Sequence, residues 1–94
     1  MIEKEFIVNN KLGLHLRPAT ELVRRISNFK AAVQFIKDDE VADGKSVISL
    51  MTMVLTYGDK VKVIVDGEDE VEVMKIIEDF FGNNFNFQLE DISK

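Results

Sequence analysis

The clearest structural signal in this 94-residue chain is the alternation at residues 60–66, KVKVIVD. Valines alternate with lysines at its start, and a period of two residues is typical of a strand that buries one face and exposes the other. Such a face is stable when a second layer covers it. We therefore expect the chain to build a sheet with one covered side.

Three other short segments are also predicted to be strands. Residues 2–8 are rich in β-branched side chains and end at the turn-forming pair Asn9-Asn10. Residues 31–37 have strand composition and lead into a charged turn, after which residues 40–43 form a brief further strand. The sheet is therefore expected to contain four strands.

Three segments show the apolar spacing of an amphipathic helix. The first begins just after His15, because Pro18 suits the first turn of a helix, where its missing N–H would have no partner. The second follows Ser46, a good N-cap, and the third follows Gly67, has acidic residues near its start and ends at Gly82. The apolar positions are Ala19, Leu22, Val23, Ile26 and Phe29, then Val47, Ile48, Leu50, Met51, Val54 and Leu55, and finally Val73, Met74, Ile77, Phe80 and Phe81.

The resulting order of elements, β-α-β-β-α-β-α, predicts an α+β fold with helices on one face of a single sheet. A chain of this length supports one hydrophobic core, so we expect a single domain at 1–94, with a core at 2–82 and a tail at 83–94. Apolar residues alternate in the tail, which fits either a frayed end or an added edge strand. These residues are Phe85, Phe87 and Leu89.

Composition and charge exclude several classes of function. The sequence has no cysteine, so disulfides, thiolate metal sites and cysteine nucleophiles are ruled out and a reducing cytoplasm is expected. The N-terminus lacks the features of a signal peptide, and no apolar run approaches the roughly 20 residues of a membrane span. A net charge of −5 disfavours nucleic acid and anionic membranes as main partners.

The charges are unevenly distributed along the chain. Residues 10–37 contain six basic residues and one acidic residue, whereas residues 66–91 contain nine acidic residues and one basic residue. A locally basic surface suits an acidic protein partner or a phosphate group. Ordinary solvated faces would give the same pattern, so the charges alone do not define a site.

The single histidine and the single proline of the chain both lie in residues 13–19, GLHLRPA. A lone histidine is often structural, and leucines on both sides would suit a half-buried position. The position of His15 favours a functional role, because it immediately precedes a helix, whose free N–H groups and dipole attract anions. Arg17 adds a guanidinium that can bind two phosphate oxygens. This stretch is therefore a candidate site for transient phosphoryl transfer to an imidazole.

The sequence lacks the residues that other kinds of functional site require. One histidine without cysteine leaves only a carboxylate-rich zinc site, and the acidic residues 38–40 lack the spacing of a Ca²⁺ loop. The sequence has no nucleotide-binding glycine loop and no serine in a nucleophile-elbow context. A small chain is also poorly suited to enclosing a deep pocket, so we do not expect a stand-alone enzyme.

The sequence resembles the HPr family, the histidine phosphocarriers of the phosphoenolpyruvate-dependent phosphotransferase system. The resemblance rests on residues 13–19, on Lys45-Ser46-Val47-Ile48 and Met51, and on the order of elements. It covers roughly residues 2–82 and implies an open-faced β-sandwich, in which three helices cover one face of a four-stranded antiparallel sheet. We expect neither a metal nor a cofactor.

By this resemblance, His15 accepts a phosphoryl group at Nδ1 from phosphorylated enzyme I and passes it to a histidine of an enzyme IIA-type protein. Arg17 matches the family arginine that helps to neutralise the phosphate. The protein is then expected to be a monomeric cytoplasmic carrier whose partners hold most of the catalytic machinery. Five residues match the partner-facing surface of the family: Thr20, Arg24, Val47, Ile48 and Met51.

Ser46 has two interpretations. As an N-cap, its hydroxyl would stabilise the second helix by ~1 kcal/mol, which is sufficient to explain a serine at this place. In some HPr proteins a dedicated serine kinase phosphorylates the matching residue, which would put negative charge against the partner surface. We favour the N-cap, and the two roles are compatible.

Two residues depart from the family pattern. Leu16 stands where a small residue is usual, and Ser49 stands where many members of the sugar system have glycine. Residues 46–50 resemble the nitrogen-related branch about as well as the sugar branch, so the chain is either a phosphocarrier of sugar uptake or a nitrogen-type regulatory phosphoprotein. A non-catalytic α/β interaction module, in which His15 is incidental, is a third alternative.

Overall fold

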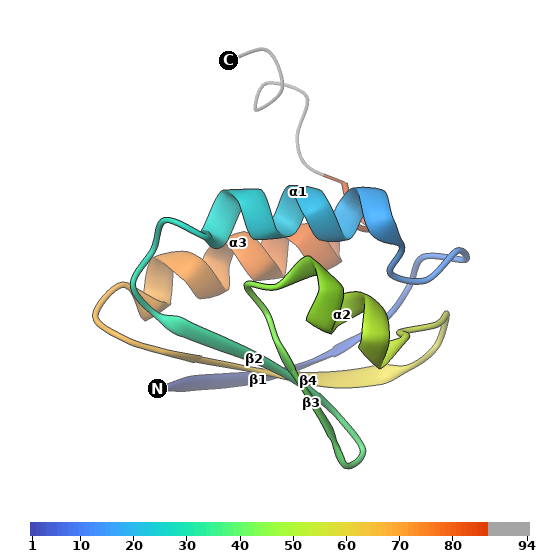
Figure 1. Cartoon of the computed structure of the whole chain (residues 1–94), viewed down its shortest axis with the longest axis horizontal. Coiled ribbons are helices and arrows are strands. Elements are labelled where there is room, and N and C mark those ends of the chain that lie inside the picture. The colour runs from blue at the N-terminus through green and yellow to red at the C-terminus, as the bar shows by residue number, and fades with distance from the viewer. Residues whose placement is uncertain (87–94) are drawn as a thin grey trace.

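A computed structural model describes residues 1–86 of the protein (Figure 1). The elements follow the predicted order, and the three helices lie together on one side of the sheet, which confirms the open-faced β-sandwich. The elements are β1 (Ile2–Ile7), α1 (Leu16–Ile26), β2 (Ala32–Lys37), β3 (Glu40–Asp43), α2 (Val47–Met53), β4 (Lys60–Asp66) and α3 (Glu70–Gly82).

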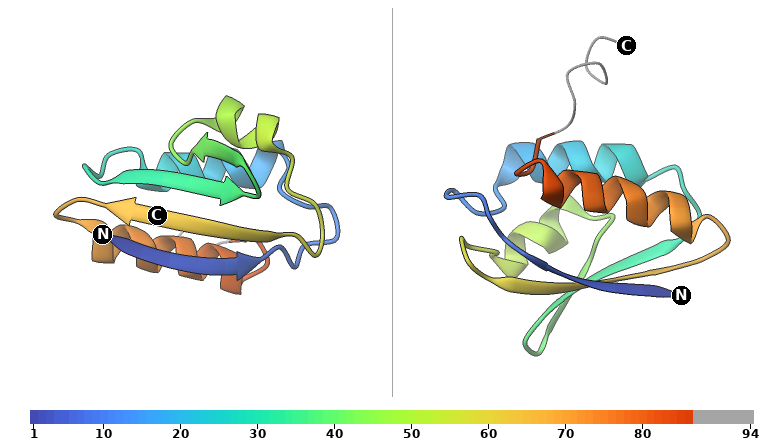
Figure 2. Two further views of the ribbon diagram at one scale, coloured as in Figure 1. Left: turned by 90° about the horizontal axis from the view of Figure 1, so that it is seen from below. Right: turned by 180° about the vertical axis from the view of Figure 1, so that it is seen from behind.

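The four strands form one antiparallel sheet in the order β1-β4-β2-β3. β4 lies in the interior of the sheet, where Val63 pairs with Lys4 of β1 and with Phe35 of β2. Figure 2 shows the sheet from below, with no helix on that face. The site must therefore be built on the helical side or at an end of the sheet.

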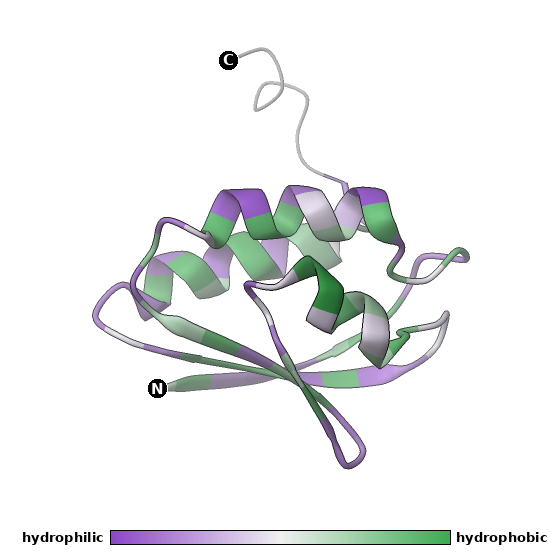
Figure 3. Cartoon of the chain, in the orientation of Figure 1, coloured by the Kyte–Doolittle hydropathy of each residue, from purple (hydrophilic) through white to green (hydrophobic). Residues whose placement is uncertain are grey.

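The covered face of the sheet supplies one side of the hydrophobic core. The three alternating valines of β4, Val61, Val63 and Val65, are fully buried, as the alternation predicted. Leu22 and Ile26 of α1 are also fully buried. Figure 3 shows the corresponding pattern, with polar and apolar residues alternating along the strands. The remaining helices contribute Leu50, Met53, Val73, Met74, Ile77, Phe80 and Phe81.

An aromatic cluster joins α3 to the chain that follows it. The ring of Phe85 stacks on Phe80 with 4.7 Å between the centroids, and it meets Phe81 edge-on at 5.3 Å. Phe85 is 4% exposed, so the core includes a residue of the predicted tail. The other residues of the predicted alternation, Phe87 and Leu89, lie outside the described residues.

Two helices end earlier than their apolar spacing suggests. α1 ends at Ile26, and Phe29 packs against the core from the turn that follows. α2 ends at Met53, because Val54 adopts the left-handed backbone conformation, with φ of 55°. Leu55 is nevertheless buried, so the apolar positions were identified correctly although their helix is shorter.

The acidic residues at the start of α3 bind backbone groups of neighbouring turns. Asp69 holds the N-cap position but makes no capping hydrogen bond. Its carboxylate instead accepts the N–H groups of Lys30 and Ala31, each at 2.8 Å, and these bonds lower the pKa of Asp69. Glu70 accepts the N–H of Gly67 at 3.0 Å. These carboxylates therefore tie the α1–β2 and β4–α3 connections together.

The described helices are short, and the longest, α3, has 13 residues. No helix within residues 1–86 is both long and apolar enough to cross a membrane. In the same part of the chain, no three histidine, aspartate or glutamate side chains are grouped so that they could hold a metal ion.

Because Phe85 stacks on the core although it lies after α3, we predict that it contributes to the free energy of unfolding. Phe85→Ala should lower the free energy of unfolding by about 3 kcal/mol, because it removes a buried ring and leaves a cavity. Asn86→Ala is the control, since Asn86 is exposed, and it should change the value by less than about 0.5 kcal/mol. Urea unfolding measures both, and equal effects of the two substitutions would contradict the packing of Phe85.

Candidate functional site

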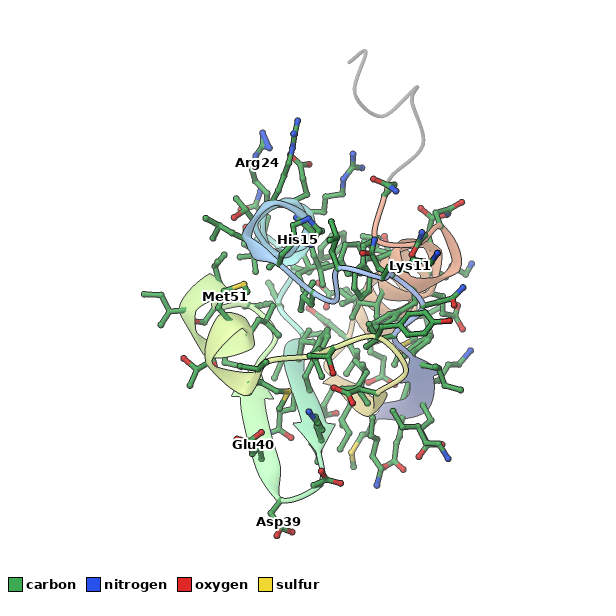
Figure 4. The ribbon with its side chains drawn as sticks, turned by 90° about the vertical axis from the view of Figure 1, so that its right-hand side faces the viewer. Lys11, His15, Arg24, Asp39, Glu40 and Met51 are labelled. Carbon is green, nitrogen blue, oxygen red and sulfur yellow. The ribbon has the colours of Figure 1, made fainter. Side chains whose placement is uncertain are left out.

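His15 occupies the N-cap of α1, as the sequence predicted. Figure 4 looks at the end of the molecule where α1 begins: His15 lies between Lys11 of the preceding loop and Met51 of α2. Asp39 of the β2–β3 turn and Glu40 at the start of β3 lie far from it. The imidazole is half-buried, so it is held by the fold and still reaches the surface.

The loop before His15 is fixed to the fold at both ends. At its start, Val8 exchanges backbone hydrogen bonds with the α2–β4 connection: its N–H donates to Asp59 O at 2.8 Å, and its carbonyl accepts the N–H of Gly58 at 2.7 Å. At its end, the N–H of Leu14 donates to Leu55 O at 2.9 Å. The α2–β4 connection therefore determines where His15 lies.

Gly13 allows the close approach of these two segments. Its φ is +71°, and a Cβ at this position would lie 2.4 Å from Leu55 O and 3.1 Å from Thr56 Cα. A side chain would thus meet backbone atoms that cannot turn aside. The glycine that precedes the histidine motif is required by packing as well as by its backbone conformation.

A half-buried ion pair supports the α2–β4 connection. Lys37 Nζ lies 2.9 Å from Asp59 Oδ2 and donates to Val54 O at 3.2 Å. Asp59 also accepts the backbone N–H of Thr56 at 2.8 Å. The Thr56 bond, followed by the bond from Lys37, lowers the pKa of Asp59, and the bond to Asp59 raises the pKa of Lys37. Both side chains are 24% exposed.

The ring of His15 has a defined direction. Nδ1 lies 3.1 Å from Gly13 O. A carbonyl oxygen accepts hydrogen bonds and cannot donate them, so Nδ1 is the donor in this contact. The His15 side chain makes no capping hydrogen bond, and Pro18 has no N–H. The first turn of α1 therefore keeps backbone N–H groups, such as that of Arg17, available to an anion.

A cavity of about 370 Å³ lies beside the histidine. His15 and Arg17 both line it, so the structure brings the two predicted catalytic residues together. Charged side chains reach it from α1, and residues from the β1–α1 loop and from the chain after α3 complete its wall. The lining residues are Asn10, His15, Arg17, Pro18, Glu21, Arg25, Phe85 and Asn86.

Sequence reasoning missed the part of this wall that lies after α3. Phe85 was noted only as part of an apolar alternation, and Asn86 was not noted at all. Asn10 was read as a turn signal, whereas its Nδ2 also donates to Asn84 O at 3.1 Å and so links the two sides of the wall. This contact joins residues 74 positions apart, so no local pattern could have indicated it.

The residues predicted to face partners differ in accessibility. On α1, Thr20 is exposed, with its hydroxyl donating to Leu16 O at 2.8 Å, and Arg24 is exposed and pairs with Glu21 at 2.8 Å. On α2, Ile48 is 80% exposed. Two of the α2 residues, Val47 and Met51, are half-buried and pack against the core.

Two leucines add to the apolar surface around His15. Leu12 precedes it in the loop and is 77% exposed, and Leu16 follows it and is 63% exposed. Exposed apolar side chains that lie together mark a surface that a partner covers, whereas single ones are ordinary. Ile48 of α2 is a further exposed apolar side chain, so the residues predicted to face partners include apolar as well as basic groups.

Ser46 forms the predicted N-cap of α2. Its Oγ accepts the N–H of Ser49 at 3.2 Å, and the Oγ of Ser49 accepts the N–H of Asp43 at 2.9 Å. The two serines thus connect the start of α2 to the end of β3. Both hydroxyls have a structural use in this arrangement.

Comparison with known proteins agrees with this geometry. A family model described as the PTS HPr component phosphorylation site matches residues 2–83. The chain belongs to the HPr family. The phosphocarrier protein HPr of Xylella fastidiosa (strain 9a5c) is 36% identical over 86 residues, which cover 92% of this chain and 97% of that protein.

Solved structures of HPr proteins show the same fold. An HPr from Thermoanaerobacter tengcongensis superposes with a TM-score of 0.86 at 32% identity, covering 95% of this chain and all of that one. Crh of Bacillus subtilis, described as a domain-swapped dimer, has a TM-score of 0.69 at 29% identity and covers 89% of this chain and 97% of its own. The HPr family match ends at residue 83, so Phe85 and Asn86 of the cavity wall lie beyond it.

Substituting Gly13 tests the close approach of the loop to Leu55. Gly13→Ala should lower the free energy of unfolding by about 3 kcal/mol, since it combines an unfavourable left-handed residue with overpacking against backbone. Gly58→Ala is the matched control: Gly58 has φ of +89° but open space around its Cβ position, so the cost should be only about 1 kcal/mol. Thermal or urea unfolding compares them, and equal losses would refute the close approach.

Asp59 should contribute to the acid sensitivity of the fold. Its folded pKa lies below its unfolded value, so its stabilising contribution is complete above the unfolded pKa of about 4 and is lost as the pH falls through the folded pKa. Asp59→Asn should therefore reduce stability near pH 7 and flatten its decline in acid, whereas Asp39→Asn in the exposed β2–β3 turn should do neither. Urea unfolding as a function of pH measures this; parallel curves for all three proteins would contradict it.

Proposed function

We propose that this protein is a phosphocarrier that takes a phosphoryl group from phosphorylated enzyme I onto Nδ1 of His15 and donates it to a histidine of an enzyme IIA-type acceptor. The observation that carries the proposal is the position of His15 at the N-terminus of α1, with Arg17 lining the same cavity. Membership of the HPr family supports it.

The start of α1 offers a seat for the transferred group. Backbone N–H groups of the first turn and the positive end of the helix dipole attract a phosphoryl group attached to the ring. Arg17 can neutralise two of its oxygens with one guanidinium. Because His15 and Arg17 both reach the surface at this cavity, the group would be stabilised lightly and could leave again, which a carrier requires.

The surface around His15 suits brief contacts with other proteins. Basic residues such as Arg17 and Arg24 can steer an acidic partner, and exposed Leu12, Leu16 and Ile48 supply a small apolar contact. As in the family it belongs to, the protein would act as a monomeric carrier in the cytoplasm. The partners would supply most of the catalytic groups, so the protein is not a stand-alone enzyme.

The branch of the system is a separate question. Uptake of sugars and nitrogen-type regulation both need the same chemistry at His15, and they differ in the IIA-type protein that receives the group. Transfer rates to acceptors of the two branches would separate them. Phosphorylation of Ser46 by a serine kinase stays a prediction from the resemblance, since the N-cap already explains that residue.

The carrier role is tested by intact-mass analysis after incubation with phosphoenolpyruvate and enzyme I. We expect one added phosphoryl mass, lost on brief acid treatment and absent from His15→Ala, whose circular dichroism should remain that of the folded domain. A His15→Ala variant that still gains the mass would refute the assignment. A wild-type protein that gains none, beside a competent control carrier, would instead favour an interaction module.

Arg17 should affect transfer more than stability. Arg17→Ala should slow phosphoryl transfer about 10²-fold, the usual effect of removing one donor to a developing oxyanion, and should change stability by less than about 0.5 kcal/mol because the side chain is exposed. Lys30→Ala is the control, since Lys30 is an exposed cation in the α1–β2 turn. Rapid-quench measurement of the transfer rate compares them, and similar rates for both variants would exclude the role of Arg17.

A further inference from the structure

The contact between His15 and Gly13 has a consequence for the nucleophile. Nδ1 of His15 lies 3.1 Å from Gly13 O and donates a hydrogen bond to it. In a neutral imidazole with a proton on Nδ1, the lone pair is on Nε2. The atom to which the proposed function assigns the phosphoryl group is therefore protonated in this arrangement.

We propose that the Gly13 carbonyl holds the Nδ1 proton of His15 in the resting carrier, so that Nδ1 becomes a nucleophile only after the ring leaves this carbonyl. The inference rests on the proposed function, because it concerns the atom that function uses. Gly13 O is then a positioning group: it touches the reacting ring and keeps it in an unreactive tautomer.

The carbonyl itself cannot move to release the ring. Gly13 is buried and directly follows a turn in which its N–H donates to Asn10 O at 2.8 Å. The next residue, Leu14, is bound to Leu55 O at 2.9 Å. With both neighbours of the peptide fixed, the side chain of His15 must rotate instead.

Phosphoryl transfer to Nδ1 of His15 requires two proton movements on the ring. The Nδ1 proton passes to water and a proton enters at Nε2, which moves the lone pair to Nδ1. That lone pair forms the new N–P bond while the N–P bond of phosphorylated enzyme I breaks. The electron pair of the broken N–P bond returns to the ring nitrogen of enzyme I, and that nitrogen takes a proton from water. Loss of the Gly13 contact thus precedes bond formation.

This arrangement assigns a role to the approaching partner. In the free carrier the ring is held against Gly13 by the bond from Nδ1. A partner that contacts the exposed Leu12 and Leu16 on either side of the histidine is placed to turn the ring. Transfer would then depend on docking as well as on collision.

Asn10 is the residue that stabilises the turn carrying the carbonyl. Its Oδ1 accepts the N–H of Leu12 at 2.9 Å, and its Nδ2 donates to Asn84 O at 3.1 Å. Removing this side chain loosens the turn and leaves the Gly13 carbonyl and the imidazole as chemical groups, although Asn10 also lines the cavity beside His15. The neighbouring Asn9 is exposed and provides a matched control.

The ring nitrogens can be observed directly by ¹⁵N NMR of the full chain, at a pH where His15 is neutral. We expect the proton on Nδ1 in the resting protein, with a coupling through the hydrogen bond to the carbonyl carbon of Gly13. After phosphorylation we expect phosphorus on Nδ1, the proton on Nε2 and no such coupling. A resting ring with its proton on Nε2 would overturn the proposal, as would phosphorus on Nε2 with the Gly13 coupling retained.

Substitutions of Asn10 and Asn9 test whether the turn that carries the Gly13 carbonyl determines the tautomer of His15. Asn10→Ala should lower the ratio of the Nδ1–H to the Nε2–H tautomer, by at most about fivefold, because it removes the side-chain bonds that support the turn while the Gly13 carbonyl itself remains. Asn9→Ala should leave it unchanged. Equal ratios in the two variants, with both folded by their amide spectra, would contradict a proton held by the turn. Because the resting protein is measured, this result is independent of whether enzyme I phosphorylates the chain.

Discussion

The hydrogen bond from the Leu14 N–H to Leu55 O, 2.9 Å long, is the contact on which the site depends. It joins the residue before His15 to the chain after α2, across a gap that admits no Cβ on Gly13. His15 follows directly, so its backbone is fixed before α1 begins. The histidine therefore combines a fixed backbone with a side chain that can rotate, as a carrier with two successive partners needs.

Leu55 is in turn held by contacts that belong to the fold. Lys37 of β2 binds both Val54 O and Asp59, and Asp59 caps the turn at Thr56. The stability of the sheet and the geometry of the histidine are thus linked through the α2–β4 connection. A domain of this size has a modest core, and placing the site on backbone contacts next to that core avoids the need for a deep pocket.

Features that depend on neighbouring residues in the sequence were predicted well. The valines of β4 are buried because alternation places them on one face, Ser46 caps α2 because a serine there can accept an N–H, and α1 begins after His15 because Pro18 suits a first turn. These outcomes follow from local backbone geometry, which a short stretch of sequence determines.

Features that depend on distant contacts were not predictable. Phe85 joins the core because it meets Phe80 across a turn, although its own segment has no strong pattern. The link from Asn10 to Asn84 and the direction of the His15 ring toward Gly13 also arise from tertiary packing. The sequence motif identified the reactive residue, and the fold determines how that residue is held.

The central claim, that the loop before His15 is pinned to the α2–β4 connection, is tested most directly by amide hydrogen exchange of Leu14. If the bond to Leu55 O forms as described, this amide should be protected nearly as strongly as that of Val63 in β4 and should exchange only through unfolding of most of the domain. Exchange as fast as that of the exposed Lys11 amide would show that the loop opens locally, and would contradict a fixed backbone for His15.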